Sequence, residues 1–377
     1  MKERSKKLID IIFCIILLIF LLSLMFSLLF SKEKSFSEKE NRVLKTRPSV
    51  KIYRILDGRF FSEFSKYCAD QFPFRESFTG ISSFIDLSLG RIEANGIIVI
   101  NNKVLIPRND YSNNQILHDN LKTIATFIES NKSNGLPSYI VVAPRSLDVN
   151  KEKLPICFST DYGTAEYDAL YNTIKKQNLI DTLPCLTKNV KEKNFYNTDH
   201  HWTTHGAYIA YLEITNRLGI EPYPIDFFNV DIVSTDFLGT SFSRSGLYSF
   251  DDKDTIVLYR YKNDDKIIIT RNGKERPLYD FSALEHSDKY RIFLGGNTDV
   301  LEIRNQEAKP KLLIIKDSFA NSVIPFLTLH FDIDVIDLRY YKNSLSSYIS
   351  SNDFEAVLLL FGIDTLATET SCINIRK

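Results

Sequence analysis

Residues 311–321 read Lys-Leu-Leu-Ile-Ile-Lys-Asp-Ser-Phe-Ala-Asn. An apolar run that ends in Asp317-Ser318 predicts a buried strand, a tight turn and then a helix over 319–329. A serine at the carboxyl end of a parallel strand lies where open α/β sheets bind their ligands. Ser318 is therefore a candidate nucleophile. The structural alternative is that Asp317 or Ser318 is simply the N-cap of the helix.

The alternation of apolar runs and helical segments occurs on both sides of the middle of the chain. Helices are expected at 115–130 and near 344–350, and strands at 138–143, 335–338 and 356–361. Continuous apolar strands joined by helices indicate a parallel sheet that is covered on both faces. The fold class expected from this pattern is α/β.

A different pattern separates these two blocks. Residues 255–261 and 267–270 are typical of an antiparallel hairpin, and Asn272-Gly273 predicts a second turn. We therefore interpret about 226–295 as an antiparallel β insertion in the α/β domain.

The N-terminus has the composition of a membrane span. Four basic residues lie within the first seven, and Asp10 is the one charged residue in 8–30. Twenty helical residues cross the roughly 30 Å hydrocarbon core of a bilayer. A cleaved signal peptide is the main alternative, but its apolar region is usually about 7 to 15 residues long and ends at small residues. The expectation is an uncleaved signal anchor over 1–31.

The rest of the chain is expected to form a stalk with short helices at 32–90 and a catalytic domain at 91–377. Four basic residues precede the span and six follow it, so the charge count alone does not give the orientation. Because long C-terminal domains cross the membrane largely regardless of charge, we expect a single-pass cell-membrane protein with an extracytoplasmic C-terminal domain.

Overall composition excludes several classes of protein. Hydrophobic residues make up 44% and charged residues 25%, which is ordinary for a globular protein. Lys plus Arg equals Asp plus Glu at 47 each, which argues against a dedicated nucleic-acid binder.

Outside the apolar run, Cys68, Cys157, Cys185 and Cys372 have wide spacings and no zinc-ribbon pattern, so free thiols and disulfides are equally expected.

Residues 196–206 read Tyr-Asn-Thr-Asp-His-His-Trp-Thr-Thr-His-Gly and hold three of the six histidines and the one tryptophan. A helix is expected at 207–218, with Thr203 or Thr204 as its N-cap, which leaves His201 in the preceding loop. A serine nucleophile needs an imidazole to accept its proton and a carboxylate to orient that imidazole. His201 and Asp199 supply both.

Two other interpretations of this segment stay open. A zinc site would use Asp199, His201 and His205, although a histidine pair four residues apart forms a metal clamp only when both lie in one helix, and here only His205 would. The segment can also be a structural loop whose histidines are satisfied by hydrogen bonds.

The motifs together resemble a known family. Asp199-His-His-Trp202 resembles the signature of the DHHW protein family, which is related to alginate O-acetyltransferase proteins with an SGNH-hydrolase-like fold. Asp317-Ser-Phe319 resembles the family's late motif and Asp70-Gln-Phe-Pro-Phe-Arg75 its early one, and the resemblance spans roughly 36–365. It implies a three-layer parallel sheet, a triad of Ser318, His201 and Asp199, and acyl transfer to a carbohydrate hydroxyl. It implies no cofactor, and an acetyl donor delivered by a membrane-bound O-acyltransferase partner.

One position departs from the family pattern. SGNH enzymes usually have glycine before Asp-Ser, and this chain has Lys316. In the wider pattern a Gly and an Asn complete the oxyanion hole, for which Gly296 and Asn297 are candidates, with an ordinary glycine-rich turn as the alternative. Arg145 follows the strand at 138–143, where it could hold a sugar or carboxylate or be a solvated loop residue.

The leading hypothesis is a membrane-anchored O-acetyltransferase or acetylesterase that acts on hydroxyls of a cell-surface or secreted polysaccharide and contacts the bilayer through residues 8–30. The second hypothesis, motivated by Lys316, is a non-catalytic polysaccharide-binding or assembly protein that retains the fold. The third is a metal-dependent hydrolase.

Overall fold

The computed structural model describes residues 2–37, 42–101, 103–109, 114–154, 164–188, 192–248 and 250–376. The chain divides into two compact units. Unit 1 comprises residues 1–95 and 246–248, and unit 2 comprises 96–245 and 249–377.

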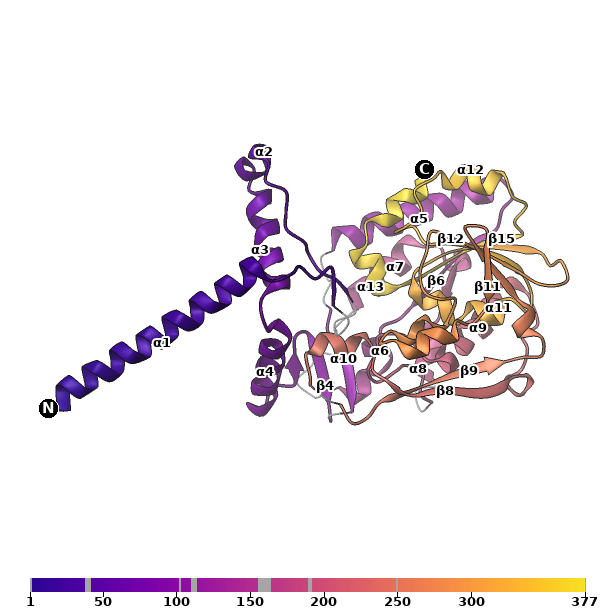
Figure 1. The fold of residues 1–377 in the computed structure, drawn as a ribbon. Coiled ribbons are helices and arrows are strands. Elements are labelled where there is room, and N and C mark those ends of the chain that lie inside the picture. The colour runs from indigo at the N-terminus through magenta and orange to yellow at the C-terminus, as the bar shows by residue number, and fades with distance from the viewer. Residues whose placement is uncertain are drawn as a thin grey trace. The chain divides into compact units, whose positions relative to one another are not determined.

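Unit 1 begins with the long helix α1 (Lys2–Phe30), drawn in indigo in Figure 1. Within it, Lys6–Leu28 is 23 residues long, has a mean hydropathy of 3.1 and contains no buried residue. By length and composition this segment can cross a membrane. The other elements of unit 1 are short: β1 (Phe36–Ser37), β2 (Arg42–Val43), α2 (Ile52–Leu56), α3 (Arg59–Gln71), α4 (Arg75–Ser88) and β3 (Glu93–Ala94).

Unit 2 is built on a sheet that, among the described residues, has eight strands in the order β11-β10-β12-β14-β13-β15-β6-β7. Five of them run parallel: β6 (Ser138–Ala143), β7 (Leu179–Asp181), β13 (Lys311–Lys316), β14 (Asp332–Ile336) and β15 (Ala356–Gly362). The other three are antiparallel and lie at one edge: β10 (Ile268–Arg271), β11 (Lys274–Pro277) and β12 (Val300–Arg304). The mixed α/β class with a parallel-rich sheet is confirmed.

Alternate residues of the parallel strands enter two separate cores. On β13, Leu312 and Ile314 belong to one apolar cluster, and Leu313 and Ile315 belong to the other. Successive side chains of a strand point to opposite faces, so this division shows that both faces of the sheet are covered. The chain thus forms the expected three layers.

Helices from different parts of the chain cover the two faces. One core includes residues of α9 (Thr204–Leu218) and α11 (Ile324–Leu327). The other core includes residues of α5 (Gln115–Ser133), α7 (Thr164–Thr173) and α13 (Ile363–Thr368), and α12 (Leu345–Ser350) packs against it. Figure 1 shows these helices on either side of the sheet. Three further short helices are α6 (Ser146–Val149), α8 (Leu183–Lys188) and α10 (Thr240–Ser245).

Two expectations about local structure need correction. Residues 319–329 do not form one α-helix, because a 3₁₀ turn, η7 (Ser318–Ser322), comes before α11. Pro325 lies in the first turn of α11, and it lacks the N–H that would continue a helical ladder from the preceding residues.

The strand pairing in the insertion also differs from the expected hairpin. Strand β9 (Asp254–Arg260) pairs with β8 (Asn229–Phe237) and not with β10. Strand β10 instead joins the main sheet through β12, and it pairs with β11 across the turn at Asn272-Gly273, which is confirmed. Strand β10 is paired on both of its edges, by β11 and by β12, so it has no free edge for β9. Strands β4 (Ile97–Ile100) and β5 (Val104–Pro107) form a separate hairpin.

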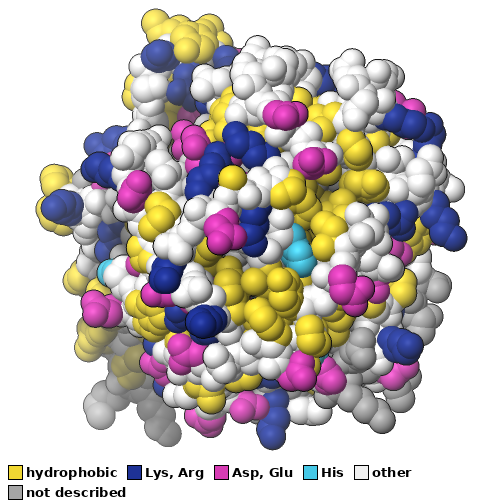
Figure 2. Space-filling view, turned by 90° about the vertical axis from the view of Figure 1, so that its right-hand side faces the viewer, with side chains coloured by type: hydrophobic (Ala, Val, Ile, Leu, Met, Phe, Trp, Pro, Cys, Tyr) yellow, Lys and Arg dark blue, Asp and Glu magenta, His cyan; other side chains and the backbone are white. Residues whose placement is uncertain are grey.

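No disulfide joins any two of the cysteines that the structure describes. Cys14, Cys68, Cys185 and Cys372 form no disulfide, and Cys157 lies outside the described residues. Basic and acidic side chains are interspersed over the face drawn in Figure 2.

Candidate active site

Ser318 lies directly after β13, at the carboxyl end of the parallel part of the sheet. Asp317 is the N-cap of η7: its Oδ1 accepts from the Phe319 N–H at 2.9 Å, and its Oδ2 accepts from the Gly362 N–H at 2.7 Å. The sequence offered Asp317 or Ser318 as the N-cap, and the structure shows that Asp317 is the cap. The Ser318 hydroxyl is left to interact with His201.

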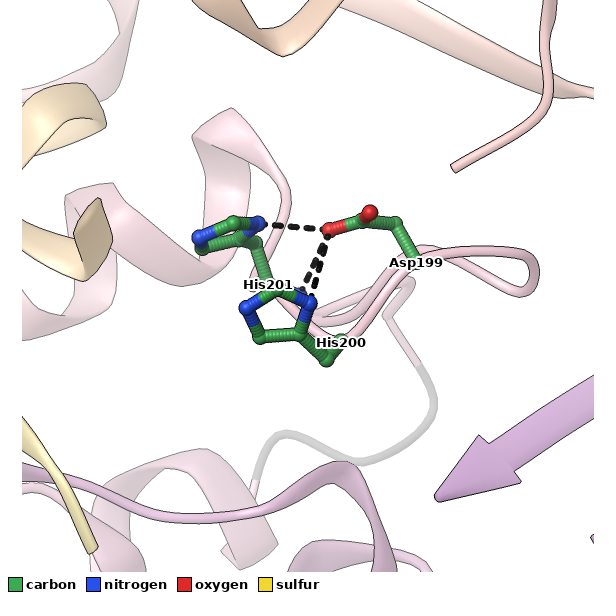
Figure 3. Close-up of side chains that lie close together, drawn as sticks. All are labelled: Asp199, His200 and His201. Carbon is green, nitrogen blue, oxygen red and sulfur yellow. Dashed lines mark hydrogen bonds and ion pairs between the residues drawn. The ribbon is translucent and has the colours of Figure 1, made fainter. Parts of the chain in front are cut away.

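His201 connects the serine to a carboxylate. Its Nε2 lies 2.8 Å from the Ser318 Oγ, and its Nδ1 lies 2.6 Å from the Asp199 Oδ1. The same carboxylate oxygen accepts from the His201 backbone N–H at 2.9 Å. Figure 3 shows the imidazole rings of His200 and His201 both facing this carboxylate. The structure thus brings the three predicted catalytic residues into one hydrogen-bonded row.

The loop that carries Asp199 and His201 precedes α9, and a backbone bridge joins its two ends. Phe195 and Trp202 form an isolated antiparallel bridge, and the side chain of Thr203 caps α9 by accepting from the Gly206 N–H at 3.2 Å. His201 therefore lies just before the helix, as expected. Gly219 has a φ of 70° at the end of α9, the left-handed conformation that glycine adopts without strain.

A buried aspartate fixes the start of this loop. Asp254, at the first position of β9, has no exposed surface, and its Oδ2 accepts from the backbone N–H and the hydroxyl of Thr198, each at 2.7 Å. Its Oδ1 accepts from the Asn197 N–H at 3.0 Å. Charge-assisted hydrogen bonds of this kind are about twice as strong as neutral ones. They hold the residues just before Asp199 in place.

The second oxygen of Asp199 is held by the start of α10. Its Oδ2 accepts from the backbone N–H of Thr240 at 2.7 Å and from the Thr240 hydroxyl at 2.9 Å. Gly239 allows this approach, because a Cβ on that residue would lie 2.3 Å from the Asp199 side chain. With both oxygens engaged, the carboxylate has one orientation relative to His201.

Aromatic rings fix the position of the His201 imidazole. The Tyr290 ring stacks on it with centroids 4.0 Å apart and planes 9° from parallel, and the Phe319 ring packs at 5.0 Å. The one tryptophan, Trp202, is fully buried and donates from Nε1 to the Phe319 carbonyl at 3.0 Å and to the Ser322 Oγ at 2.9 Å. Trp202 thereby links the histidine loop to the turn that carries the serine.

The charges around Asp199 favour its ionised form. Burial by itself would raise the pKa of Asp199, but the adjacent imidazoles of His201 and His200 and the hydrogen bonds from His201 and Thr240 outweigh it and hold the pKa well below its usual range. Burial, together with the neighbouring His201, lowers the pKa of His200 to about 4. Near neutral pH the site therefore holds a carboxylate beside a neutral His200.

Lys316 lies directly under the serine turn and is only 1% exposed. Its Nζ donates to the Asn297 Oδ1 at 2.6 Å and to the Asn321 Oδ1 at 2.7 Å. Lys316, Asp317 and Ser318 all lie outside the residues with positive φ, so the backbone here does not require the usual glycine. The departure from the family pattern thus leaves the turn unstrained and places a cation beside two amides.

The remaining predicted residues have different surroundings. Gly296 has a φ of 92° in a turn where Leu294 and Gly295 are also left-handed, a conformation that requires glycine-like freedom. Asn297 reaches the serine turn through Lys316 and also accepts from the Asn321 Nδ2 at 3.3 Å. An oxyanion role for Gly296 or Asn297 stays a prediction.

Arg145 is not a solvated loop residue, and that alternative is wrong. It is 6% exposed, and its guanidinium donates to Asp148 at 2.9 and 3.1 Å and to Glu166 at 3.2 Å. These carboxylates already neutralise the charge that a substrate anion would use. Arg145 still lines a small pocket beside His200 and Phe319, together with Asp364.

The set of ligands expected for zinc is not brought together as predicted. His205 lies in α9, where it forms an ion pair with Glu192 and contacts the Tyr259 hydroxyl at 3.3 Å. Among the described residues, the cluster that could hold a metal is Asp199, His200 and His201. Both ring nitrogens of His201 already face Asp199 and Ser318, so a metal there would displace one of these two hydrogen bonds. The residues present fit the serine chemistry better than a metal site.

Sequence analysis missed the contribution of the segment 226–295. Thr240, Asp254 and Tyr290 all come from it and hold the histidine loop. The one local signal was Gly239-Thr240, a glycine directly before a capping residue. Nothing in the sequence indicated that this pair faces Asp199, because 40 residues separate them and no periodicity connects them.

Comparisons with known proteins agree with this geometry. Residues 168–336 match the family model described as DHHW protein. The resemblance to the DHHW family is confirmed. Residues 104–225 also match the model described as SGNH hydrolase-like domain, acetyltransferase AlgX. The DHHW match contains the histidine loop, the segment 226–295 and the serine turn.

Solved structures with this fold include a DHHW family protein from Eubacterium siraeum, with a TM-score of 0.63 and 20% identity over 76% of this chain and 96% of that one. Bacillus cereus PatB1 has a TM-score of 0.59 and 18% identity over 73% of this chain and 98% of that one. PatB1 has also been solved with a sulfonyl adduct. At these identities the likeness shows a shared fold with the DHHW and PatB1 structures. No curated protein matches the chain at a significant level.

Proposed function

We propose that the chain is an extracytoplasmic O-acyltransferase that uses Ser318 as nucleophile and transfers acetyl groups to hydroxyls of a polysaccharide, anchored in the membrane by α1. The observation that carries the proposal is the hydrogen-bonded row from Ser318 through His201 to Asp199. Support also comes from the match to the acetyltransferase family model and from the apolar length of α1.

The first half-reaction acylates the serine. The His201 Nε2 accepts the proton of the Ser318 hydroxyl as the Oγ attacks the acetyl carbonyl carbon. Asp199 holds the His201 Nδ1–H and stabilises the imidazolium that forms. The tetrahedral intermediate then expels the leaving group of the donor, which takes the proton from Nε2, and acetyl-Ser318 remains.

The second half-reaction transfers the acetyl group. A sugar hydroxyl gives its proton to the His201 Nε2 and attacks the ester carbonyl, and Ser318 leaves with that proton. The same intermediate reacts with water in an acetylesterase, so the two activities differ in the acceptor that reaches the site. A membrane-bound O-acyltransferase is the proposed source of the acetyl group.

The negative charge of each tetrahedral intermediate needs stabilisation. Hydrogen-bond donors placed where charge develops contribute about 10² to 10³ in kcat each. The Asn297 and Asn321 amides and the Lys316 ammonium form a connected group beside the serine turn. We propose that this group supports the oxyanion, with Asn297 as the donor.

Acetyl transfer from a small ester to a sugar oligomer tests the proposal. Full-length protein in detergent is compared with Ser318→Ala, His201→Ala and Asp199→Ala, and we expect each to lose up to about 10⁴-fold in kcat because the three act as one unit. His200→Ala is the matched control, since His200 also contacts Asp199 but does not contact Ser318. A loss in this control equal to the loss in His201→Ala would contradict the assigned roles.

A labelling experiment separates the enzyme from a non-catalytic binding protein. A sulfonyl fluoride should modify Ser318 in the wild type, and the modification should be far slower in His201→Ala, because the imidazole activates the nucleophile. Peptide mass spectrometry locates the adduct. A protein that binds polysaccharide but whose Ser318 stays unmodified would be the non-catalytic alternative.

A further inference from the structure

Helix α4 exposes the side that a soluble helix normally buries. Its buried residues are Gly80 and Ser83. Four of its large apolar residues are 42 to 67% exposed: Phe78, Ile81, Phe84 and Ile85. Amphipathic helices of globular proteins usually have the reverse arrangement. An apolar helix face of this kind is typical of a surface that meets another apolar phase.

The junction between α3 and α4 continues this apolar surface. It reads Phe72-Pro73-Phe74, and the side chains of Phe72 and Phe74 are 39% and 72% exposed. Phe74 has a φ of 55°, a left-handed conformation that residues with a large side chain rarely adopt. Strained residues of this kind concentrate at functional sites. The backbone therefore presents a large apolar ring that is mostly exposed.

Hydrogen bonds tie the same junction to the chain that leaves α1. The Gln71 side chain accepts from the Lys34 N–H at 3.0 Å and donates to the Lys34 carbonyl at 2.8 Å and to the Lys45 carbonyl at 3.0 Å. Asp70 accepts from the Lys45 N–H at 2.8 Å. Lys34 follows the last residue of α1 by four positions, a stretch of chain that spans at most about 14 Å.

Asp70 and Gln71 thus keep the exposed phenylalanines next to the end of the apolar helix. They belong to the early motif, residues 70–75, which the catalytic chemistry does not use. If α1 spans a bilayer, the junction must lie close to the point where α1 leaves it. At that depth the neighbouring phase is the boundary between lipid headgroups and acyl chains.

We propose that the α3–α4 junction and the exposed side of α4 form an interfacial anchor, which lies in the headgroup boundary of the membrane that α1 spans. The anchor consists of Phe72, Phe74, Phe78, Ile81, Phe84 and Ile85. The inference rests on the proposed membrane-spanning role of α1 and is independent of the acyl chemistry. Lipid is the occupant because the tether fixes the junction near the bilayer exit whatever partner is present.

Depth-dependent fluorescence quenching tests the anchor in the full-length protein. The protein is reconstituted into phosphatidylcholine vesicles whose lipids carry bromine either near the glycerol or near the chain ends. Three reporters are compared with the parent protein: Phe74→Trp in the junction, Leu17→Trp in the middle of α1, and Phe281→Trp as an exposed aromatic site in unit 2. Trp202 is fully buried and contributes the same background to each.

The anchor predicts that Phe74→Trp loses more emission to the shallow bromines and Leu17→Trp more to the deep ones. Quenching at position 17 without quenching at 74 would overturn the anchor and leave a protein partner as the occupant. Absence of quenching at 17 would overturn the membrane span of α1 itself. Equal quenching at 74 and 281 would show general adsorption to vesicles, which also overturns the anchor.

A second variant keeps the backbone while it removes the ring. Asparagine adopts the left-handed conformation readily, so Phe74→Asn should leave the melting temperature unchanged or higher. Combined with a Phe78→Trp reporter, it should reduce the shallow quenching seen with Phe78→Trp alone. Unchanged quenching in the combined variant would show that Phe74 does not insert, contrary to the proposal.

Discussion

Lys316 shows how one buried side chain can replace a residue type that the family pattern prefers. Burial lowers its pKa to about 8, although Asp337 opposes this shift. The other charged groups that act on it are Arg339, which is paired with Asp337, and Asp317, which is hydrogen-bonded to the backbone. The ammonium orients both asparagine amides because it donates to the oxygen of each.

We expect Lys316→Met to lower kcat by roughly one to two orders of magnitude, because the Asn297 amide would lose its fixed orientation. The wild type should also lose activity as the pH rises through about 8, where Lys316 gives up its proton, and the variant should lack this alkaline decline. A pH profile of kcat in both proteins checks this. An identical alkaline limb in the variant would assign that limb to another group.

The same pKa has a consequence for stability. Because the folded-state pKa of Lys316 lies below its unfolded value of 10.5, the unfolded chain binds more protons between about pH 8 and 10.5, so this residue makes stability rise with pH in that window. The alkaline loss of activity should therefore occur without unfolding.

At the scale of elements, Asp317 joins the end of β13 to the end of β15. One oxygen caps η7 and the other accepts from the Gly362 N–H. Gly362 has little room around it, since a Cβ there would lie 2.7 Å from the Phe319 ring. Two neighbouring strands are thus joined directly before Ser318, the proposed nucleophile.

Asp317→Asn should lower the free energy of unfolding by about 1 to 3 kcal/mol, because its amide N–H₂ would face one of two backbone donors and leave it unpaired. It should also lower kcat, since Ser318 would no longer be fixed relative to His201. Urea denaturation and kinetics measure the two effects. Asp280→Asn, at the N-cap of the 3₁₀ helix η5 (Phe281–Glu285), is the matched control and should leave kcat unchanged. A similar loss of kcat in the control would indicate a general effect of weakened caps.

The segment 226–295 has a larger role in the structure than its sequence pattern predicts. The sequence predicts an antiparallel β insertion in the α/β domain at this segment, and the division of the chain into domains at 31 and 90 stays a prediction. In the structure the segment provides four strands, of which β10 and β11 join the edge of the main sheet and β8 and β9 form a separate pair. It also provides residues that hold Asp199 and His201. It is part of the machinery that positions the site.

At the scale of the whole molecule, the proposed substrate requires the C-terminal domain to lie outside the cytoplasm. A fusion of alkaline phosphatase to the C-terminus should be active in cells, because that enzyme needs an oxidising compartment for its disulfides. A fluorescent protein that folds only in the cytoplasm should be dark at the same position. A bright fusion with inactive phosphatase would place the domain inside and contradict the surface-polymer proposal.

The sequence by itself determined the features that depend on local pattern. Apolar runs and their spacing gave the parallel strands, the helix after the histidines and the membrane-length helix, because burial on two faces and a helical period leave a direct trace in residue order. The proposed triad of Ser318, His201 and Asp199 was also recognisable, because its two segments together resemble the DHHW family pattern.

Only the tertiary structure decided which residues hold the proposed triad in place. Thr240, Asp254 and Tyr290 contact the histidine loop across 40 to 90 residues, a separation over which neither propensity nor periodicity carries information. The same holds for Arg145, whose charge is paired with the neighbouring Asp148 and with two carboxylates from distant parts of the chain, Glu166 and Asp364. Packing of the sheet and its helices brings these distant segments within bonding distance. Their hydrogen bonds and ion pairs therefore form only once that packing is complete.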